Sequence, residues 1–125
     1  MKKIINTPNA PAPIGPYSQA VLVDKTLYMS GQIAINPATG ELVISDIKLE
    51  TLQVMENIKA VLKAAGMNFS HVVKCSIFIS NMNDFAGINQ IYATYFDDNY
   101  PARETVEVSR LPKDVNVEIS VIATL

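Results

Sequence analysis

The sequence is poor in the residues from which covalent cross-links and metal sites are usually built. It contains one cysteine, Cys75, and one histidine, His71, in 125 residues. A single cysteine cannot close an internal disulfide or form a multi-cysteine zinc site, and this usage is typical of a reducing compartment. His71 lies in a turn-like segment, outside any triad or metal-ligand spacing. We therefore expect no metal site.

Long apolar runs, a basic excess and glycine-rich phosphate loops are also absent. No apolar stretch approaches the ~20 residues that span a bilayer, and the N-terminal segment lacks an apolar stretch of signal-peptide length. The net charge is −2 and the pI is about 5.3, whereas nucleic-acid binding normally requires a basic face. We expect a cytoplasmic protein that acts on a small molecule, with neither a membrane nor a nucleic acid as partner.

The length and composition are those of one globular domain, which we assign to residues 1–125. Hydrophobic residues make up 49% of the chain and charged residues 18%. A domain near this size hides roughly 65–70% of its unfolded surface, which is enough for one core.

Proline and hydrophobic alternation define the N-terminal half. Four of the seven prolines lie within residues 6–16, which predicts an extended arm that leads Tyr17 to the first strand. Two β-rich runs, Gln19–Val23 and Thr26–Gln32, flank a two-residue turn and predict a hairpin. Gly31 in the second run indicates a bulge or a close approach of the backbone to another group.

Helical periodicity appears twice. The first helix begins with Ser45 or Asp46 as its cap and ends at Gly66, where glycine favours a left-handed cap. Its predicted buried stripe comprises Leu49, Leu52, Met55, Ile58, Leu62 and Ala65. The second helix begins with Asn83 or Asp84 as its cap and ends before Pro101. Its predicted shared face comprises Phe85, Ile88, Tyr92, Tyr95 and Phe96.

The remaining segments are predicted strands. Val72–Ile79 lies between the helices and carries Cys75 on its apolar side, as a small core residue. Two alternating runs within residues 102–125, joined by a proline-containing loop, predict a C-terminal β-hairpin. The resulting order is ββαβαββ, an α+β fold with one mixed sheet and two helices packed on one face.

The expected hairpin register determines the candidate polar site. If Val108 and Val115 face each other, Arg103 lies opposite Ser120, and Thr105 lies opposite Glu118. Alternation then places on the face without helices the side chains of Arg103, Thr105, Glu107, Asn116, Glu118 and Ser120.

Two interpretations of Arg103 and Glu118 stay open from the pattern alone. One is an exposed cross-strand ion pair, which usually contributes under about 1 kcal/mol. In the other, Arg103 binds a ligand carboxylate in bidentate geometry, and Glu118 positions or deprotonates a water.

Short motifs run along the whole chain. They are Gly15-Pro16-Tyr17-Ser18-Gln19-Ala20, Ser30-Gly31-Gln32, Pro101-Ala102-Arg103, Val106-Glu107-Val108, Leu111-Pro112-Lys113-Asp114 and Glu118-Ile119. In these motifs the sequence resembles the RidA/YjgF family, the reactive intermediate/imine deaminases. The resemblance implies a chorismate-mutase-like fold and a homotrimer with clefts between subunits. It also implies cofactor-free hydrolysis of 2-imino or enamine acids from pyridoxal-phosphate enzymes, such as 2-iminopropanoate and 2-iminobutanoate, to 2-keto acids and ammonia.

The resemblance implies roles for residues at matching positions. Arg103 would hold the substrate carboxylate, and Glu118 would activate the attacking water. The backbone at Thr105 would contact the imine nitrogen. The residues implied to line the cleft are Tyr17, Ser30, Gly31 and Asn89.

The sequence departs from the family pattern at three positions. Glu104 replaces a small residue, Thr105 stands where many members have cysteine, and Ser120 stands where a second glutamate is frequent. Strand alternation should direct Glu104 away from the face of Arg103. Because a buried unpaired carboxylate is costly, we expect Glu104 to reach an edge, a subunit boundary or a cation.

Two other functions are compatible with the same residues. A non-catalytic regulatory trimer would use Arg103 to bind a carboxylate metabolite without turnover. An RNA-acting translation inhibitor, as proposed for relatives in the family, is the third interpretation, and the acidic pI argues against it.

Overall fold

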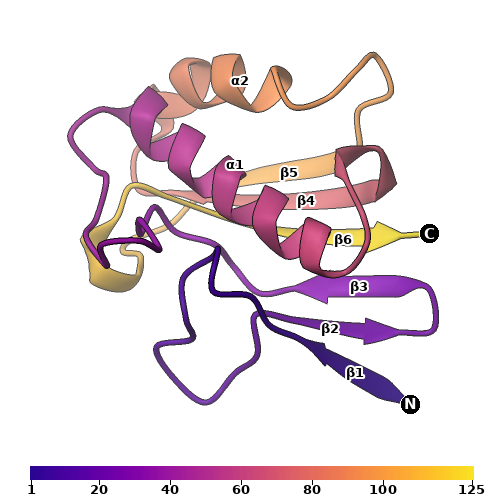
Figure 1. Cartoon of the computed structure of the whole chain (residues 1–125). Helices are drawn as coiled ribbons and strands as arrows, with labels where there is room; N and C mark the ends of the chain where they lie inside the picture. Colours follow the sequence, from indigo (N-terminus) through magenta and orange to yellow (C-terminus); the bar gives the residue numbers. More distant parts are fainter.

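A computed structural model describes the whole chain, Met1–Leu125, and shows two helices packed on one face of a sheet (Figure 1). The helices are α1 (Ile47–Ala64) and α2 (Phe85–Ala93). The strands are β1 (Lys2–Ile5), β2 (Ala20–Val23), β3 (Thr26–Met29), β4 (Val72–Ile79), β5 (Ala102–Glu107) and β6 (Val117–Thr124). Short 3-10 turns precede β4, α2 and β6. No helix combines the length and the apolar character needed to cross a membrane.

All six strands belong to one mixed sheet with the order β1-β2-β3-β6-β4-β5. The pair β4 and β5 is parallel, and the other neighbours are antiparallel. The predicted α+β class and the order ββαβαββ are confirmed, and β1 is an additional strand before them. The predicted β2–β3 hairpin also forms, with Val23 opposite Thr26.

The predicted C-terminal hairpin is wrong. Strand β5 pairs with β4, where Arg103 is the partner of Cys75 and Thr105 that of Ile77. Strand β6 lies on the other side of β4, so Ser120 is the partner of Ser76 instead of Arg103. The reason is that β4, α2 and β5 form a β-α-β crossover, which places parallel strands side by side and leaves the opposite edge of β4 for β6.

The two faces of the sheet differ in what covers them. The helix face is buried and carries Leu27, Met29, Cys75, Ile77, Ile79, Val117, Ile119, Val121 and Ala123. The opposite face, called the open face below, has no helix over it (Figure 1). Strand registers place on it Tyr28, Ser76, Phe78, Glu104, Val106, Glu118, Ser120 and Ile122. Cys75 is a core residue, as predicted.

Helix α1 begins and ends where the sequence predicts. The Asp46 carboxylate accepts hydrogen bonds from the backbone N–H groups of Lys48 and Leu49, at 2.8 and 3.1 Å, and Gly66 adopts a left-handed conformation with φ 74°. The predicted stripe is partly wrong, because Leu49 and Leu52 are exposed. Met55, Ile58 and Leu62 are buried as predicted. The other buried residues of the helix are Val54, Val61 and three polar ones, Glu50, Thr51 and Asn57. The helix is therefore rotated toward polar partners that lie far away in sequence.

Helix α2 is capped differently from the prediction. The capping side chain is that of Asn81, and not of Asn83 or Asp84. Its amide oxygen accepts a hydrogen bond from the N–H of Asn83 at 2.9 Å and starts a 3-10 turn. Asp84 occupies the N-cap of α2 without a side-chain hydrogen bond. Ile88 and Tyr92 are buried, whereas Phe85 is exposed at the start of the helix.

The proline-rich arm is held against the sheet by one buried side chain. The Gln19 amide oxygen accepts from the N–H of Thr7 at 2.7 Å, and its nitrogen donates to the carbonyls of Thr7 and Pro11 at 3.0 and 2.9 Å. A segment with few N–H donors cannot join a strand ladder, so a side-chain amide satisfies its backbone. This arrangement places Tyr17 at the edge of the open face.

Candidate functional site

Three of the other residues expected at the site lie around Glu118. This residue projects from β6 onto the open face and is half-buried. Its side chain shares a hollow of about 340 Å³ with Tyr17, Ser30 and Gly31. Ile14 and Pro112 complete the lining. One wall therefore comes from the arm, one from the segment after β3, and one from β6.

Gly31 allows the close approach on which this hollow depends. A Cβ atom built on Gly31 would lie 2.7 Å from the carboxyl carbon and from one carboxyl oxygen of Glu118. No side chain other than hydrogen fits in that space. The strand glycine therefore marks a close approach, which is one of the two outcomes expected from the sequence. Backbone hydrogen bonds between Gln32 and Ile119, at 2.8 and 3.1 Å, hold the two segments together.

The lining residues are fixed by local hydrogen bonds. The Ser30 hydroxyl donates to the carbonyl of Ser18 at 2.6 Å, and the Tyr17 hydroxyl accepts from the N–H of Ile14 at 3.2 Å. The Tyr17 hydroxyl proton is left free to donate. The wall of the hollow is therefore ordered before any ligand arrives.

The Glu118 carboxyl has no partner in the chain. No hydrogen bond or ion pair reaches it, and burial raises its pKa above the ordinary value of 4.5. Burial disfavours the charged form of a carboxyl group, and no nearby cation compensates. A carboxyl of this kind is a stronger base than an exposed one once it is ionised.

Arg103 lies in a second hollow, on the helix face. Its guanidinium carbon is 5.0 Å from the centre of the Tyr92 ring and 5.5 Å from that of Phe85. Its Nη1 donates to the side-chain oxygen of Asn89 at 2.7 Å. The hollow measures about 240 Å³ and is lined by Asn89, Tyr92, Ala93, Tyr100, Pro101 and Arg103.

No carboxylate neutralises Arg103. The ion pairs of the chain join Lys74 to Glu104, at 3.0 Å, and Arg110 to Asp114, at 2.6 Å. The aromatic rings and Asn89 orient the guanidinium and leave most of its N–H donors uncommitted. An arginine presented in this way is suited to bind a carboxylate with two parallel hydrogen bonds.

Glu104 does not compete for Arg103. It points to the open face, where it pairs with Lys74 and accepts a hydrogen bond from the Ser76 hydroxyl. That hydrogen bond and the Lys74 ammonium hold the pKa of Glu104 below its ordinary value. The expectation that Glu104 reaches a cation away from Arg103 is confirmed.

Thr105 lies on the helix face, next to Arg103 along β5. Its hydroxyl is buried and has no hydrogen-bond partner. Its Cα partner across the parallel pair is Ile77. The predicted placement of Thr105 opposite Glu118 is therefore wrong, and for the same reason as the hairpin: β4 lies between the two strands.

The consequence is that one chain contains two separate half-sites. The half with Arg103, Asn89 and Thr105 faces the helices, and the half with Glu118, Gly31, Ser30 and Tyr17 lies on the open face. The exposed Arg103–Glu118 ion pair considered from the sequence does not exist, since the two side chains leave different strands toward opposite faces.

Sequence reasoning missed the aromatic part of the Arg103 half-site. The periodicity predicts only a shared helix face for Phe85 and Tyr92, whereas both rings contact the guanidinium. The signal was present in the spacing: Phe85, Asn89 and Tyr92 follow one another at four and three residues and share one face of α2.

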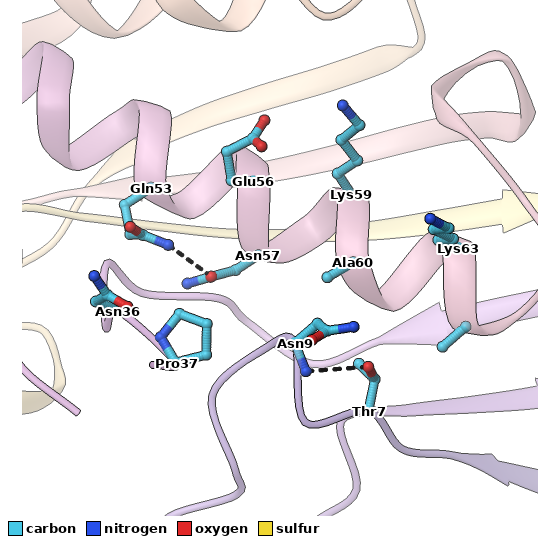
Figure 2. Close-up of a pocket in the computed structure, with 11 residues that line it drawn as sticks. Thr7, Asn9, Asn36, Pro37, Gln53, Glu56, Asn57, Lys59, Ala60 and Lys63 are labelled. Atoms are coloured by element: carbon cyan, nitrogen blue, oxygen red, sulfur yellow. Dashed lines mark hydrogen bonds between the residues drawn. The ribbon is translucent and has the colours of Figure 1, made fainter. Parts of the chain in front are cut away.

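A larger hollow lies elsewhere, between α1 and the segments around Thr7 and Asn36, and measures about 620 Å³ (Figure 2). Its polar groups are largely satisfied within the chain. Gln53 donates to Asn57 at 2.9 Å, and Asn57 donates to the carbonyls of Ile33 and Ile35 at 3.1 and 3.0 Å. The charged ends of Glu56 and Lys59 point away from Pro37 on the opposite wall (Figure 2). These contacts serve to anchor loops to α1.

Known proteins resemble this chain over its whole length. The model of the family described as Endoribonuclease L-PSP matches residues 7–125. A RutC family protein of Pyrococcus horikoshii is 56% identical over 123 residues, which cover 98% of each chain. A protein of Bos taurus named 2-iminobutanoate/2-iminopropanoate deaminase is 49% identical over 123 residues, which cover 98% of this chain and 90% of the relative.

The solved structures agree with these sequence relatives. The crystal structure of Escherichia coli TdcF with bound serine has a TM-score of 0.94 and 44% identity, over 98% of both chains. The crystal structure of a Rid family protein from Yersinia pestis has a TM-score of 0.97 and 54% identity, over the full length of both chains. With a family model matched from residue 7 to residue 125 and relatives about half identical, this chain belongs to the RidA/YjgF family.

Proposed function

We propose that this protein hydrolyses small 2-imino acids and their enamine tautomers to 2-keto acids and ammonia, in clefts that neighbouring copies of the chain form together. The observation that carries the proposal is the pair of complementary half-sites: an arginine without a carboxylate partner, and a partly buried carboxyl without a cation. A 2-imino acid supplies a carboxylate for the first and an electrophilic carbon for water activated by the second.

The half-sites explain why a second copy takes part. Arg103 and Glu118 lie on opposite faces of the sheet, so one substrate cannot contact both within a chain. In a ring with cyclic symmetry, one surface of each copy meets a different surface of the next. Each interface of a homotrimer would then join the Arg103 half of one copy to the Glu118 half of its neighbour.

The mechanism uses positioning and one proton carrier. Arg103 holds the substrate carboxylate, which fixes the place of the adjacent imine carbon. Asn89 orients the guanidinium, and Tyr17, Ser30 and Gly31 line the wall at Glu118. The backbone at Thr105 contacts the substrate nitrogen. In this arrangement a water beside Glu118 lies against one face of the imine carbon that it attacks.

The proton balance closes with Glu118 alone. The ionised carboxylate takes a proton as the water oxygen bonds to the imine carbon and gives it to the nitrogen, so that a tetrahedral carbinolamine forms. Glu118 then takes the hydroxyl proton of the carbinolamine and passes it to the nitrogen, the C=O bond forms as the C–N bond breaks, and ammonia leaves the 2-keto acid. Because such imines already hydrolyse in water, the barrier that the enzyme must remove is lower than for a typical hydrolase. One cation and one base are enough for this task.

A second candidate function is the binding of carboxylate metabolites without turnover. It is favoured by the relative TdcF, whose structure holds serine, an amino acid with a carboxylate but no imine. The two functions differ in their need for a base, because binding requires Arg103 and only turnover requires Glu118 as well.

Replacing Arg103 tests the carboxylate anchor. A serine/threonine dehydratase generates 2-aminoacrylate, and imine decay is followed with and without the protein. We expect the wild type to accelerate decay and Arg103→Ala to lower kcat/KM by at least about 100-fold, because a charged hydrogen-bond pair is lost. The control Arg110→Ala removes a surface arginine that pairs with Asp114, and should stay within about twofold of wild type. Equal decay with and without protein would contradict the proposal.

Mixed oligomers test whether the site is shared. Arg103→Ala and Glu118→Gln are co-expressed with different tags, and oligomers that carry both tags are purified. In a trimer that carries both tags, one interface of three joins two intact halves, so about a third of the wild-type activity should return. Each variant alone should be inactive. If the mixture is as inactive as its components, the site does not combine residues from two copies.

Glu118→Gln also tests the base and its raised pKa. We expect the variant to bind the carboxylate of a 2-keto acid but to lose turnover. The wild-type kcat/KM should rise with pH along an acid limb whose midpoint lies above 4.5.

The same variant tests the cost of the Glu118 charge to stability. Below the unfolded pKa the Glu118 carboxyl is protonated in both the folded and the unfolded state. As pH rises through the raised folded pKa, charging the buried carboxyl destabilises the fold. Thermal melts should therefore show Glu118→Gln more stable than wild type near neutral pH, and equally stable in acid. Retained turnover would exclude Glu118 as the base.

Gly31→Ala tests the close approach. The added methyl would displace the Glu118 side chain, whose atoms lie 2.7 to 2.9 Å from the built Cβ. Because only a flexible side chain has to move, we expect at least a tenfold loss of kcat, about 1.4 kcal/mol in the barrier, with an unchanged melting temperature. In the control Gly15→Ala, the new methyl meets only Tyr17 at 3.7 Å, and kcat should be kept. An equal effect of the two changes would argue against a precise placement of Glu118.

A further inference from the structure

A carboxylate that the mechanism does not use is buried beneath the start of β6. Glu50 lies in the first turn of α1 and is 0% exposed. One of its oxygens accepts from the backbone N–H groups of Asn116 and Val117, at 2.7 and 3.1 Å, and the other accepts from the Asn116 side-chain nitrogen at 2.7 Å. Neither ion pair of the chain includes Glu50. Three N–H donors from one short segment therefore take the place of a cation.

The segment that Glu50 holds, Asn116 and Val117, lacks a strand partner on the side of β6 that faces β3 and Gln32. Along β6, the Ile119 N–H pairs with the carbonyl of Gln32 at 3.1 Å. Because alternate residues of a strand present their N–H groups to the same neighbour, the Val117 N–H points to the same side. There the chain has turned away: the carbonyl of Ala34, two residues beyond Gln32, accepts from Val43 at 2.8 Å. The Glu50 carboxylate replaces the missing backbone carbonyl.

Glu118 lies between these two attachments. Asn116 and Val117 precede it and are held by Glu50, and Ile119 follows it and is held by Gln32. The Asn116 carbonyl also accepts from the Ser80 N–H at 3.1 Å, at the end of β4. The tolerance at Glu118 is small, since its carboxyl fills the space that a methyl on Gly31 would need. A shift of the strand end would move the carboxyl along that wall.

We infer that Glu50 is a positioning residue for Glu118: from the opposite face of the sheet, it fixes the backbone that aims the Glu118 carboxyl into the site. The inference rests on the proposed function for its kinetic readout, but the geometry of Glu118 is measurable without it. Glu50 does not touch the substrate hollow and acts only through β6.

Three variants separate positioning from general stability. Glu50→Ala removes the acceptors. Glu50→Gln keeps an oxygen for the two backbone N–H groups, and its amide pairs with Asn116 once the Asn116 amide turns over. Val61→Ala removes two methyl groups from a fully buried residue of the same helix, eleven residues after Glu50. All are measured well below their melting temperatures.

We expect Glu50→Ala to lower kcat for imine hydrolysis about ten- to hundredfold. KM should stay within about threefold, because Glu50 binds the start of β6, whereas Arg103 lies on β5, on the far side of β4. Glu50→Gln and Val61→Ala should keep kcat within about threefold of wild type. In carbon-13 NMR titrations, assigned by the signal missing in Glu118→Gln, the Glu118 pKa should fall back toward 4.5 in Glu50→Ala alone.

The outcomes are distinguishable. If the wild type is active, and Glu50→Ala matches Val61→Ala both in kcat and in the Glu118 titration, the inference is overturned and the deaminase proposal stands. If the wild type does not accelerate imine decay, the proposed function fails, and the Glu118 titration alone decides the positioning role. Should Glu50→Ala fail to fold, Glu50→Asp is measured in the same way, because it retracts the carboxylate by one methylene. If Glu50→Asp has the same kcat and the same Glu118 pKa as the wild type, the inference is overturned.

Discussion

The position of β4 between β5 and β6 determines the arrangement of the candidate site. Strand β4 pairs in parallel with β5 and antiparallel with β6. A parallel neighbour requires a crossover, and the crossover contains α2, which brings Asn89 and Tyr92 to Arg103. On the other side, β6 carries Glu118 to the open face beside Gly31. One strand thus separates the cation from the carboxyl, so they cannot neutralise each other within the chain.

Both groups are kept in a state that costs folding free energy. The Glu118 carboxyl is partly buried without a partner, and its pKa is raised. The Arg103 guanidinium is oriented by aromatic rings and an amide, without a countercharge. Elsewhere the same sheet pairs its charges, as with Lys74 and Glu104 on the open face. Charged groups that the fold leaves without a partner are typical of sites that bind ligands or react.

Buried polar side chains hold the irregular segments that form the site. Gln19 satisfies the backbone of the arm that leads to Tyr17, Asn57 holds the loop after Gln32, and Glu50 holds the segment before Glu118. Each of them lies at 2% exposure or less. Segments without ladder partners have backbone groups that must be paired when they are buried, and a long polar side chain can reach them from a neighbouring element. The precision of the site therefore depends on residues outside it.

The sequence by itself determined the elements whose signals are local. A cap at Ser45 or Asp46, the left-handed Gly66, the burial of Cys75, and a bulge or close approach at Gly31 follow from spacing, backbone chemistry and alternation, and the short motifs indicate the family. The tertiary structure alone decided the neighbour of β5 and therefore the faces of Arg103 and Glu118, because an alternating strand reads the same whichever strand lies beside it. It also decided that Glu50 is buried while Leu49 and Leu52 are exposed. The burial of Glu50 depends on the backbone N–H groups of Asn116 and Val117, which have no strand partner and donate to its carboxylate. These residues lie more than sixty positions away in the sequence, so no local pattern can represent the contact.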